Sequence, residues 1–404
     1  MTAWLLDGVH DVTVFERAAH WGGHIHTVQA EVGGQALPVE MGAEFLFEEG
    51  YGGTLGVIDR FGLERWTRPM VVSLTLDQGQ TTFAMPPYSV VTTLASLRPA
   101  TLRRLWWLRA LAARAEAIAD AGDWTPTVRD LIAQTGMPTD VAEAVVIPLI
   151  ASSWGIEREQ AAALSAYCVV RVMGLRLKHR PHAVVVQGGL GRYIDALVAD
   201  APAVDFRLGA TVEPILVRDG ALCLRVDGRP HDFDEVVLAC DWHNSGALCA
   251  GDGRLAAWRA AFAAVQDTHA RVALHRDPRF MPRRRRHWCN ANFDLTLDAR
   301  PRTTIWSGRA TGLPVFRTWL RPGEDPPPST SHLAEYRHVA MVPEHLHRQA
   351  RIAALQGDGG VWAAGMYTAG VDNHESALRS ALRVAERLAP GAERVAWLAQ
   401  QISG

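Results

Sequence analysis

The sequence predicts an α/β fold in which a βαβ-type unit is interleaved with a second unit of helical or mixed α+β character. Strand, glycine turn and helix patterns occur near the start, in the middle and at the end of the chain. Between the first two of them, a tryptophan-rich stretch from about 99 to 174 has helical periodicity. A chain of 404 residues with 48% hydrophobic content is long enough for two cores.

The composition points to small-molecule chemistry. The 41 basic and 43 acidic side chains give a net charge of -2, so no overall field attracts nucleic acid or anionic lipid. The five cysteines are scattered and lack CxxC spacing, which favours reduced thiols in the cytoplasm over a disulfide framework or a zinc site. We expect no membrane span, because no stretch approaches about 18 uninterrupted apolar residues.

The first part of the chain resembles the back half of a βαβ unit. "MTAWLLDG" fits the last turns of a helix closed by Gly8, and "HDVTVFE" is a short β-branched strand that ends at Glu16. "VGGQALPVEMGAEFLF" (32–47) predicts a strand pair, and "GTLGVIDRFGLE" (53–64) predicts a helix. In a nucleotide-binding unit, a glycine-rich loop comes first and the acidic strand end follows about 20 residues later.

The rest of the chain repeats strand, turn and helix. In "HAVVVQGGLGRYIDALV" (182–198) we interpret the glycines as a turn, because no acidic residue closes a second strand as a phosphate loop would require. Period-two alternation around Asp-Gly dipeptides from 204 to 241 predicts several strands. The end, "GVWAAGMYTAGVDNHESALRSALRVAERL" (360–388), predicts a buried strand, a loop and an amphipathic helix beginning near His374.

With these segments in view, the chain resembles the flavin-containing amine oxidoreductase superfamily, and within it a bacterial group of FAD-binding proteins. The resemblance runs nearly end to end and rests on several blocks in order: "ERAAHWGGHIHT", "EMGAEFLFEEGYGGTLGVIDRFGLE", "VVVQGGLGRYIDAL", "VALHRDPRFMP", "YRHVAMVPE" and "VWAAGMYTAGVDNHESALRSALRVAERL". The chain departs from the group at "HESA", where H-E-D-G is usual, and at "TTIWSGRATGL", where a polar segment is usual. These departures put the group's substrate in question more than its cofactor.

The resemblance implies noncovalent FAD and a set of residues for its adenosine half. Glu16, at a strand end, is placed to accept hydrogen bonds from both ribose hydroxyls. Gly22 and Gly23 lack a Cβ and let the backbone approach the pyrophosphate or ribityl chain. His24 stands where the superfamily often has arginine, and Val212 matches the position whose backbone pairs with the adenine edge.

For the flavin half, the resemblance implies the last strand and helix. Gly365 would let the strand end pass against the ring, and Met366 lies where some relatives attach their flavin through cysteine, so no covalent bond is expected. The helix that begins near His374 would direct its free amide groups toward the flavin.

The predicted division gives a Rossmann-like FAD-binding domain from 1–50, 183–255 and 352–404, and a substrate or cap domain from 51–182 and 256–351. Only fifteen residues precede Glu16, so we also expect that the first strand and the glycine-rich loop are absent from this sequence. Such a chain would bind FAD poorly and fold marginally. An upstream extension encoding G-x-G-x-x-G would restore both.

The first functional hypothesis is an oxidoreductase that passes a hydride from an apolar or amine-bearing small molecule to FAD. Many amine oxidases of the superfamily place a lysine beside the flavin, but the single lysine here, Lys178, lies far from that position, so carbon–carbon desaturation competes with amine oxidation. His275 and Asp277 in "LHRDP" are the candidate catalytic residues, with a structural turn as the alternative.

The second hypothesis is a catalytically silent flavoprotein-like fold that binds a partner. Two further stretches suggest other surfaces. "RRRRHWCN" (283–290) could be a basic patch, although we favour a solvated turn. "LRRLWWLRALAARAEAIA" (102–119) could lie peripherally on lipid, although a cap helix over the substrate explains its tryptophans equally well. Oligomeric state is left open.

Overall fold

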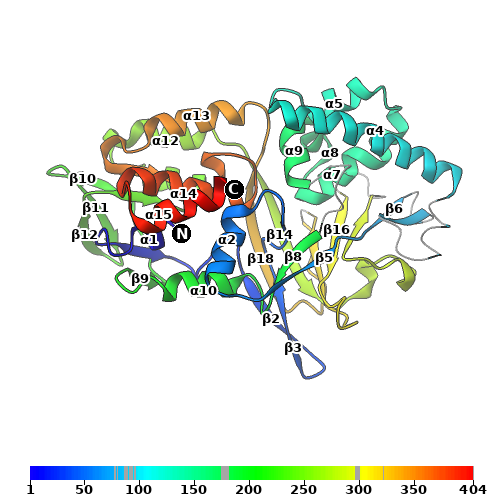
Figure 1. Ribbon diagram of the computed structural model, residues 1–404, viewed down its shortest axis with the longest axis horizontal. Coiled ribbons are helices and arrows are strands. Elements are labelled where there is room, and N and C mark those ends of the chain that lie inside the picture. Colours follow the sequence, from blue (N-terminus) through cyan, green and yellow to red (C-terminus); the bar gives the residue numbers. More distant parts are fainter. Residues whose placement is uncertain are drawn as a thin grey trace.

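The computed structural model describes residues 1–76, 79, 81–85, 90, 94, 97–173, 182–295, 301–321 and 323–403. Figure 1 shows two parts side by side, with both chain termini in one part and helices α4, α5 and α7 to α9 in the other. Within the described ranges, no helix combines the length and apolarity needed to cross a bilayer.

Two parallel strand pairs form the centre of the first part. β1 (Thr13–Glu16) pairs with β9 (Asp205–Leu208), and β13 (Val236–Leu238) pairs with β19 (Val361–Ala363). Among the described residues, each pair is a separate two-stranded sheet. The short helix α1 (Thr2–Leu6) precedes β1 and buries Trp4, Leu5 and Leu6, as the sequence predicts for the end of a helix.

Helices and a small antiparallel sheet cover these pairs. The main core cluster packs α1 against residues of the helices α2 (Gly52–Arg60), α10 (Gly191–Ala199), α14 (His374–Leu388) and α15 (Glu393–Ser403). The antiparallel sheet consists of β10 (Leu216–Arg218), β11 (Ala221–Val226) and β12 (Arg229–Phe233). Its two turns are the predicted Asp-Gly dipeptides, in which both residues have positive φ, as tight hairpins require.

A second group of short strands connects the two parts. β2 (Thr27–Val32) and β3 (Gln35–Glu40) form a hairpin around Gly33 and Gly34, both at positive φ. The strand pair predicted within 32–47 is therefore wrong in its bounds, because β3 pairs with the preceding strand. β8 (His182–Val186) pairs with β4 (Leu46–Phe47) and β5 (Arg65–Pro69).

The second part contains a seven-stranded sheet in the order β18-β14-β17-β16-β15-β6-β7. The pairing is antiparallel except between β15 and β6. Every strand comes from the ranges predicted for the cap domain, and the domain division itself stays a prediction. The strands are β6 (Val72–Leu76), β7 (Thr81–Met85), β14 (Asp267–His275), β15 (Ala291–Asp294), β16 (Arg302–Trp306), β17 (Phe316–Leu320) and β18 (His332–Val339).

The tryptophan-rich stretch is helical, as predicted, and builds its own core beside this sheet. It comprises α4 (Pro99–Ala121), α5 (Val128–Thr135), α6 (Thr139–Val141), a π-helical turn (Ala142–Val146), α7 (Ile147–Trp154), α8 (Arg158–Ala163) and α9 (Ala166–Met173). Three further helices, α11 (Trp242–Leu248), α12 (Ala256–Ala263) and α13 (His345–Leu355), pack near β13 and β19. The predicted α/β class with a cap is confirmed.

Candidate functional site

Glu16 lies at the carboxyl end of β1, as its predicted role requires. Its Oε1 accepts a hydrogen bond from the amide of Ala18 at 2.7 Å, and its side chain is only partly buried. The Glu16 carbonyl accepts from the amide of Ala210 at 2.9 Å, which brings the 210–212 segment to the same strand end. Val212 forms an isolated antiparallel bridge with Val226. The structure therefore places Glu16 and Val212 close together.

The predicted glycine doublet forms a turn that leaves amides unused. Gly22 and Gly23 have φ of 108° and 57°, and the Gly22 carbonyl accepts from the amide of Ile25 at 2.9 Å. The amides of Gly22, Gly23 and His24 donate no hydrogen bond within the described residues. Consecutive free amides of this kind can bind an anionic group such as a phosphate.

His24 is fixed against the segment that follows β3. Its carbonyl accepts from the amide of Ala43 at 2.8 Å. A Cβ on Gly42 would lie 2.1 Å from the His24 carbonyl oxygen, so only glycine permits this approach. The His24 ring makes an edge-on contact with Tyr336 at a centroid distance of 4.9 Å and lies 5.3 Å from His338.

His338 and Asp372 form an ion pair beside His24. The distance from His338 Nδ1 to Asp372 Oδ2 is 3.2 Å, and the two side chains keep 27% and 9% of their surface exposed. Burial would lower the pKa of His338, but the charge and hydrogen bond of Asp372 outweigh it and raise that pKa. Burial would likewise raise the pKa of Asp372, but the charge and hydrogen bond of His338 lower it.

His24 itself carries no charge near neutral pH. Burial, followed by the neighbouring charge of His338, lowers the pKa of His24 to about 4, against a smaller opposing effect of Asp372. Beside it, the Tyr336 hydroxyl is buried without a hydrogen-bond partner among the described residues. An unpaired buried hydroxyl of this kind is costly unless a bound group supplies the partner.

Three separate parts of the fold supply this polar cluster, which we define as His24, Tyr336, His338 and Asp372. His24 follows β1, Tyr336 and His338 come from β18 of the large sheet, and Asp372 lies in the loop before α14. A hydrogen bond with Trp154, at the end of α7 in the helical part, also lowers the pKa of Asp372. The cluster thus lies where the two parts of the molecule meet.

The sequence analysis did not single out Tyr336, His338, Asp372 or Trp154. The first three lie in or directly beside the blocks that carry the family resemblance, in "YRHVAMVPE" and before "HESA". The blocks could have drawn attention to these residues. They could not predict that His338 and Asp372 pair, because the pairing depends on how β18 and the α14 loop meet.

The predicted catalytic pair lies elsewhere. Thr268 on β14 pairs with His338, and His275 lies seven residues further along the same strand, about 24 Å away at the rise of an extended strand. His275 is 1% exposed, and burial lowers its pKa to about 4. The structure therefore does not bring His275 and Asp277 together with His24.

The partners of His275 and Asp277 are those of a structural turn. His275 Nε2 lies 2.8 Å from the Thr318 hydroxyl, and its Nδ1 accepts from the Asp277 amide at 3.1 Å. The Asp277 carboxylate accepts from the amide and the guanidinium of Arg279 at the start of a short 3-10 helix, Pro278–Phe280. A catalytic role for this pair stays a prediction.

At the amino end of α14, one side chain caps the helix and another connects it to α2. The Asn373 side chain accepts from the amide of Ser376 at 2.8 Å and caps the helix. Glu375 turns away toward α2, where it accepts from the amides of Gly53 and Thr54 at 3.0 and 2.9 Å. His374 Nε2 lies 2.5 Å from the Tyr193 hydroxyl, and burial lowers the pKa of His374 to about 4.

Gly365 and Met366 lie directly after β19. Gly365 has φ 155°, its amide donates to Ser380 on α14 at 2.8 Å, and a Cβ there would lie 2.7 Å from the Tyr367 ring. Met366 is partly buried and packs against the core cluster that also includes residues of α9, Cys168 among them. These two residues thus lie between the nucleotide-type unit and the helical part, while Lys178 lies outside the described residues.

The glycines after β8 form the predicted strand-to-helix turn. The amide of Leu190 donates to Glu40 at 2.6 Å and that of Gly191 to the Thr27 hydroxyl at 2.8 Å. A Cβ on Gly189 would lie 2.4 Å from Thr27, so the turn packs closely on the β2–β3 hairpin. Because protein groups already accept from these two amides, the turn is not arranged to hold a phosphate.

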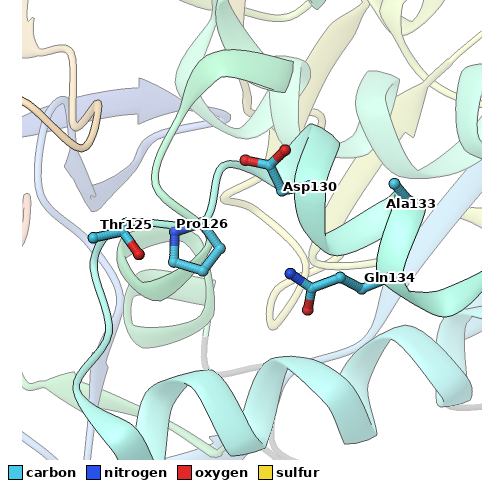
Figure 2. Close-up of a pocket in the computed structure, with 5 residues that line it drawn as sticks. All are labelled: Thr125, Pro126, Asp130, Ala133 and Gln134. Atoms are coloured by element: carbon cyan, nitrogen blue, oxygen red, sulfur yellow. The ribbon is translucent and has the colours of Figure 1, made fainter.

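A shallow hollow of about 380 Å³ lies at the start of α5, and Figure 2 shows its lining of Thr125, Pro126, Asp130, Ala133 and Gln134. Its polar groups are engaged within the protein. Asp130 accepts from the amide and hydroxyl of Thr127, and Gln134 accepts from Arg114 at 3.0 Å. Asp130 is the one titratable residue in this lining, so we do not regard the hollow as the active site.

The residues present fit a flavin dinucleotide at both ends. The second carboxylate oxygen of Glu16 is available to a ribose hydroxyl, and the free amides of Gly22 and Gly23 suit an anionic linker. The unpaired hydroxyl of Tyr336 provides a polar partner close to His24. Donors and acceptors of the right chemistry therefore follow one another from β1 to the polar cluster.

A two-part fold of this kind, with an acidic strand end and a polar cluster beneath a cap, is that of a flavin-dependent oxidoreductase. The chain belongs to the flavin-containing amine oxidoreductase family, whose profile matches residues 2–307. It is therefore an enzyme of that class, with a flavin cofactor and a small-molecule substrate. No curated protein matches the chain in sequence.

Solved structures share the fold over almost the whole chain. A CLA-producing fatty acid isomerase from P. acnes has a TM-score of 0.68 at 14% identity, covering 96% of both chains. Cyclohexylamine oxidase from Brevibacterium oxydans IH-35A has a TM-score of 0.64 at 17% identity, covering 96% of both chains. Putrescine oxidase bound to putrescine has a TM-score of 0.59 at 13% identity, again covering 96% of both chains. At these identities the likeness concerns the fold.

Proposed function

We propose that the protein binds FAD without a covalent bond and oxidises a small apolar or amine-bearing molecule beneath the helical part. The observation that supports this most strongly is the polar cluster, where β18, the α14 loop and α7 meet the turn that carries His24. The bound flavin supplies the hydride acceptor for the reaction. The protein binds and orients the substrate and excludes water around it.

Glu16 and the glycine doublet would hold the adenosine half of FAD. The free oxygen of Glu16 accepts from the ribose, and the amides of Gly22, Gly23 and His24 donate to the linker. Val212 lies near enough to Glu16 to offer its backbone to the adenine edge. Met366 occupies the place of a flavin-attaching cysteine, and a thioether does not form a bond with the ring, which supports noncovalent binding.

His338 would hold or release one proton beside the reacting carbon. Asp372 raises the pKa of His338 and so favours the protonated imidazole, while burial keeps His24 neutral. The ion pair has no net charge when both members are ionised. An environment without excess negative charge favours a substrate that is neutral when it reacts, such as an apolar compound or an unprotonated amine.

The reaction class is tested by bleaching of the bound flavin under anaerobic conditions. Substrates would be drawn from a panel of neutral amines and of apolar compounds with oxidisable carbon–carbon bonds. Hydrogen peroxide release from amines in air supports the oxidase form. Product formation only with artificial electron acceptors overturns the oxidase form and leaves the desaturase-like form. If no compound bleaches the flavin, the proposal fails in favour of a binding protein.

The role of the ion pair is tested by Asp372→Asn. Without the carboxylate, the pKa of His338 should fall, and the alkaline limit of turnover should move to lower pH with it. Asp195→Asn, an exposed change on α10, is the matched control and should leave the profile in place. An unchanged profile in Asp372→Asn would show that His338 does not govern the proton.

A further inference from the structure

Exposed apolar side chains gather in one short segment of the chain. Half of the ten large hydrophobic residues that are exposed among the described residues lie between 90 and 106. They are Val90 (76% exposed), Leu94 (62%), Leu97 (57%), Leu102 (47%) and Trp106 (59%). Isolated exposed hydrophobic residues are ordinary, whereas such a concentration marks an interaction surface.

The first turns of α4 show why these side chains are exposed. Thr101 and Leu111 lie on the buried face of the helix. Leu102 and Trp106, one turn apart, point away from that face and remain exposed. Trp106 contacts Trp107 edge-on at 4.5 Å, which keeps its ring at the surface. The exposed face at the start of α4 therefore carries the apolar Leu102 and Trp106 next to the exposed Arg98 and Arg103.

Basic residues surround this apolar face. The segment from 78 to 115 contains five arginines and no acidic residue. One of the arginines, Arg103, is paired with Asp140 at 2.6 Å. All charged side chains of the segment itself are therefore positive, although the chain as a whole is almost neutral.

The arginine run of 283–286 lies on the same side of the molecule. The 3-10 turn Arg285–His287 packs against β7, and Arg283 Nε lies 3.9 Å from the position of a Cβ on Gly79. Leu105 and Leu108 of α4 pack against the core cluster that contains Phe83 of β7, so α4 and the arginine run contact the same strand. The charge of Arg98, the residue before α4, also contributes to lowering the pKa of His287, after burial and the charges of Arg286 and Arg284. All four arginines of the run are exposed.

Two stretches far apart in sequence, each ordinary by itself, thus form one surface. We propose that Val90, Leu94, Leu97, Leu102 and Trp106, together with the arginines of 283–286 and Arg98, dock the enzyme on an anionic lipid bilayer. We call these residues the docking surface. Apolar side chains and a tryptophan enter the headgroup region, while arginines around them contact anionic headgroups. The inference is independent of the proposed reaction.

The shape of the molecule agrees with peripheral docking. Figure 1 places α4 and β6 at one end and both chain termini in the other part. A second copy of this chain would bring two sets of arginines together, which repel each other. Nucleic acid would use the arginines but would leave the side chains of Val90, Leu94, Leu97 and Leu102 exposed to water. Charge and apolar character together favour an anionic lipid surface.

The test is flotation of the full chain with lipid vesicles. The wild type should bind vesicles of phosphatidylcholine with about 30% phosphatidylglycerol and bind pure phosphatidylcholine at least about tenfold more weakly. The double variant Leu102→Asn/Trp106→Gln should lose at least about tenfold in binding to the anionic vesicles. Arg284→Gln/Arg286→Gln should lose about fivefold for each arginine, and added salt should mimic this loss.

Matched controls use exposed residues of the other part of the molecule. Arg218→Gln/Arg229→Gln on the β10–β12 sheet removes the same charge and should bind like the wild type. All substitutions lie at exposed positions, and circular dichroism and flavin absorbance verify that each variant is folded. The proposal is overturned if wild type does not float, if the controls lose as much as the docking-surface variants, or if those variants abolish self-association or RNA binding instead.

Discussion

Glu375 provides a direct test of how the site helix α14 is held. Its carboxylate is 2% exposed and accepts three hydrogen bonds: from the amides of Gly53 and Thr54 at 3.0 and 2.9 Å and from the Thr54 hydroxyl at 2.8 Å. The two amides belong to the first turn of α2, which has no side-chain cap of its own. The buried carboxylate on α14 therefore accepts hydrogen bonds from the free amides at the start of α2. Its negative charge also interacts favourably with the positive end of the α2 helix dipole.

The size of the effect follows from these contacts. Glu375→Ala leaves two buried amides and a hydroxyl without an acceptor, and each unsatisfied group costs about 1 to 3 kcal/mol. A cavity that admits water would recover part of this loss, so we expect destabilisation by about 3 to 5 kcal/mol. The ion pair of Glu375 with Arg379 at 3.3 Å adds little, because Arg379 is 42% exposed. Glu375→Gln keeps one acceptor oxygen and should lose about 2 kcal/mol.

The assay is urea unfolding at neutral pH, followed by circular dichroism. The urea midpoint should be highest for the wild type, lower for Glu375→Gln and lowest for Glu375→Ala. The slope of the unfolding free energy against urea concentration should not change. Glu386→Ala, an exposed change on the same helix, is the control and should stay within about 0.5 kcal/mol of the wild type. If Glu375→Ala also stays within about 0.5 kcal/mol, the clamp between α14 and α2 contributes nothing and the reasoning fails.

Local patterns in the sequence predicted local structure well. The Asp-Gly turns need positive φ at known positions, and the β10–β12 sheet follows from them. The prediction for 32–47 identified β3 but missed its partner β2 (Thr27–Val32). The seven-stranded sheet could not be predicted in the same way. It pairs Val72 with Ala291, a register that depends on tertiary packing rather than on any local signal.

In the candidate site, too, some residues could be identified from local sequence and others only from the tertiary structure. Glu16 and the glycine doublet were singled out by their spacing along one segment and by the family resemblance, and their cofactor role stays a prediction. The pair of His338 and Asp372 depends on where the β18 end meets the α14 loop, and that meeting has no sequence signal of its own. His275 was a candidate because it is a histidine close to an acid. It lies at the end of β14 away from the residue that pairs with His338.

The flavin attachment, the buried histidines and the predicted catalytic residue can each be tested. Acid precipitation should release all yellow colour into the supernatant, and colour retained in the pellet would contradict noncovalent binding. Burial lowers the pKa of His275 and His345 to about 4, below the unfolded value of 6.5. As the pH falls, these histidines therefore bind a proton in the unfolded chain before they do so in the folded protein. Stability should fall between about pH 6.5 and about pH 4, by up to about 3 kcal/mol for each residue. Urea midpoints across this range measure the fall. His275→Gln should make the fall shallower by the contribution of one residue, because His24, His345 and His374 have similarly lowered pKa values. An equally steep fall in the variant would count against the assignment. Turnover by His275→Gln also tests its predicted catalytic role, which is wrong if turnover persists at the wild-type rate.

The most direct test of the proposed cofactor site compares FAD with FMN. Glu16 contacts only the adenosine half of FAD in this account, so Glu16→Ala should weaken FAD binding at least about tenfold and leave FMN binding unchanged. Flavin fluorescence titrations of the full chain measure both dissociation constants, with the exposed change Glu31→Ala as control. Equal FAD affinity in Glu16→Ala and wild type, or equal losses for FAD and FMN, would contradict the placement of the cofactor along β1.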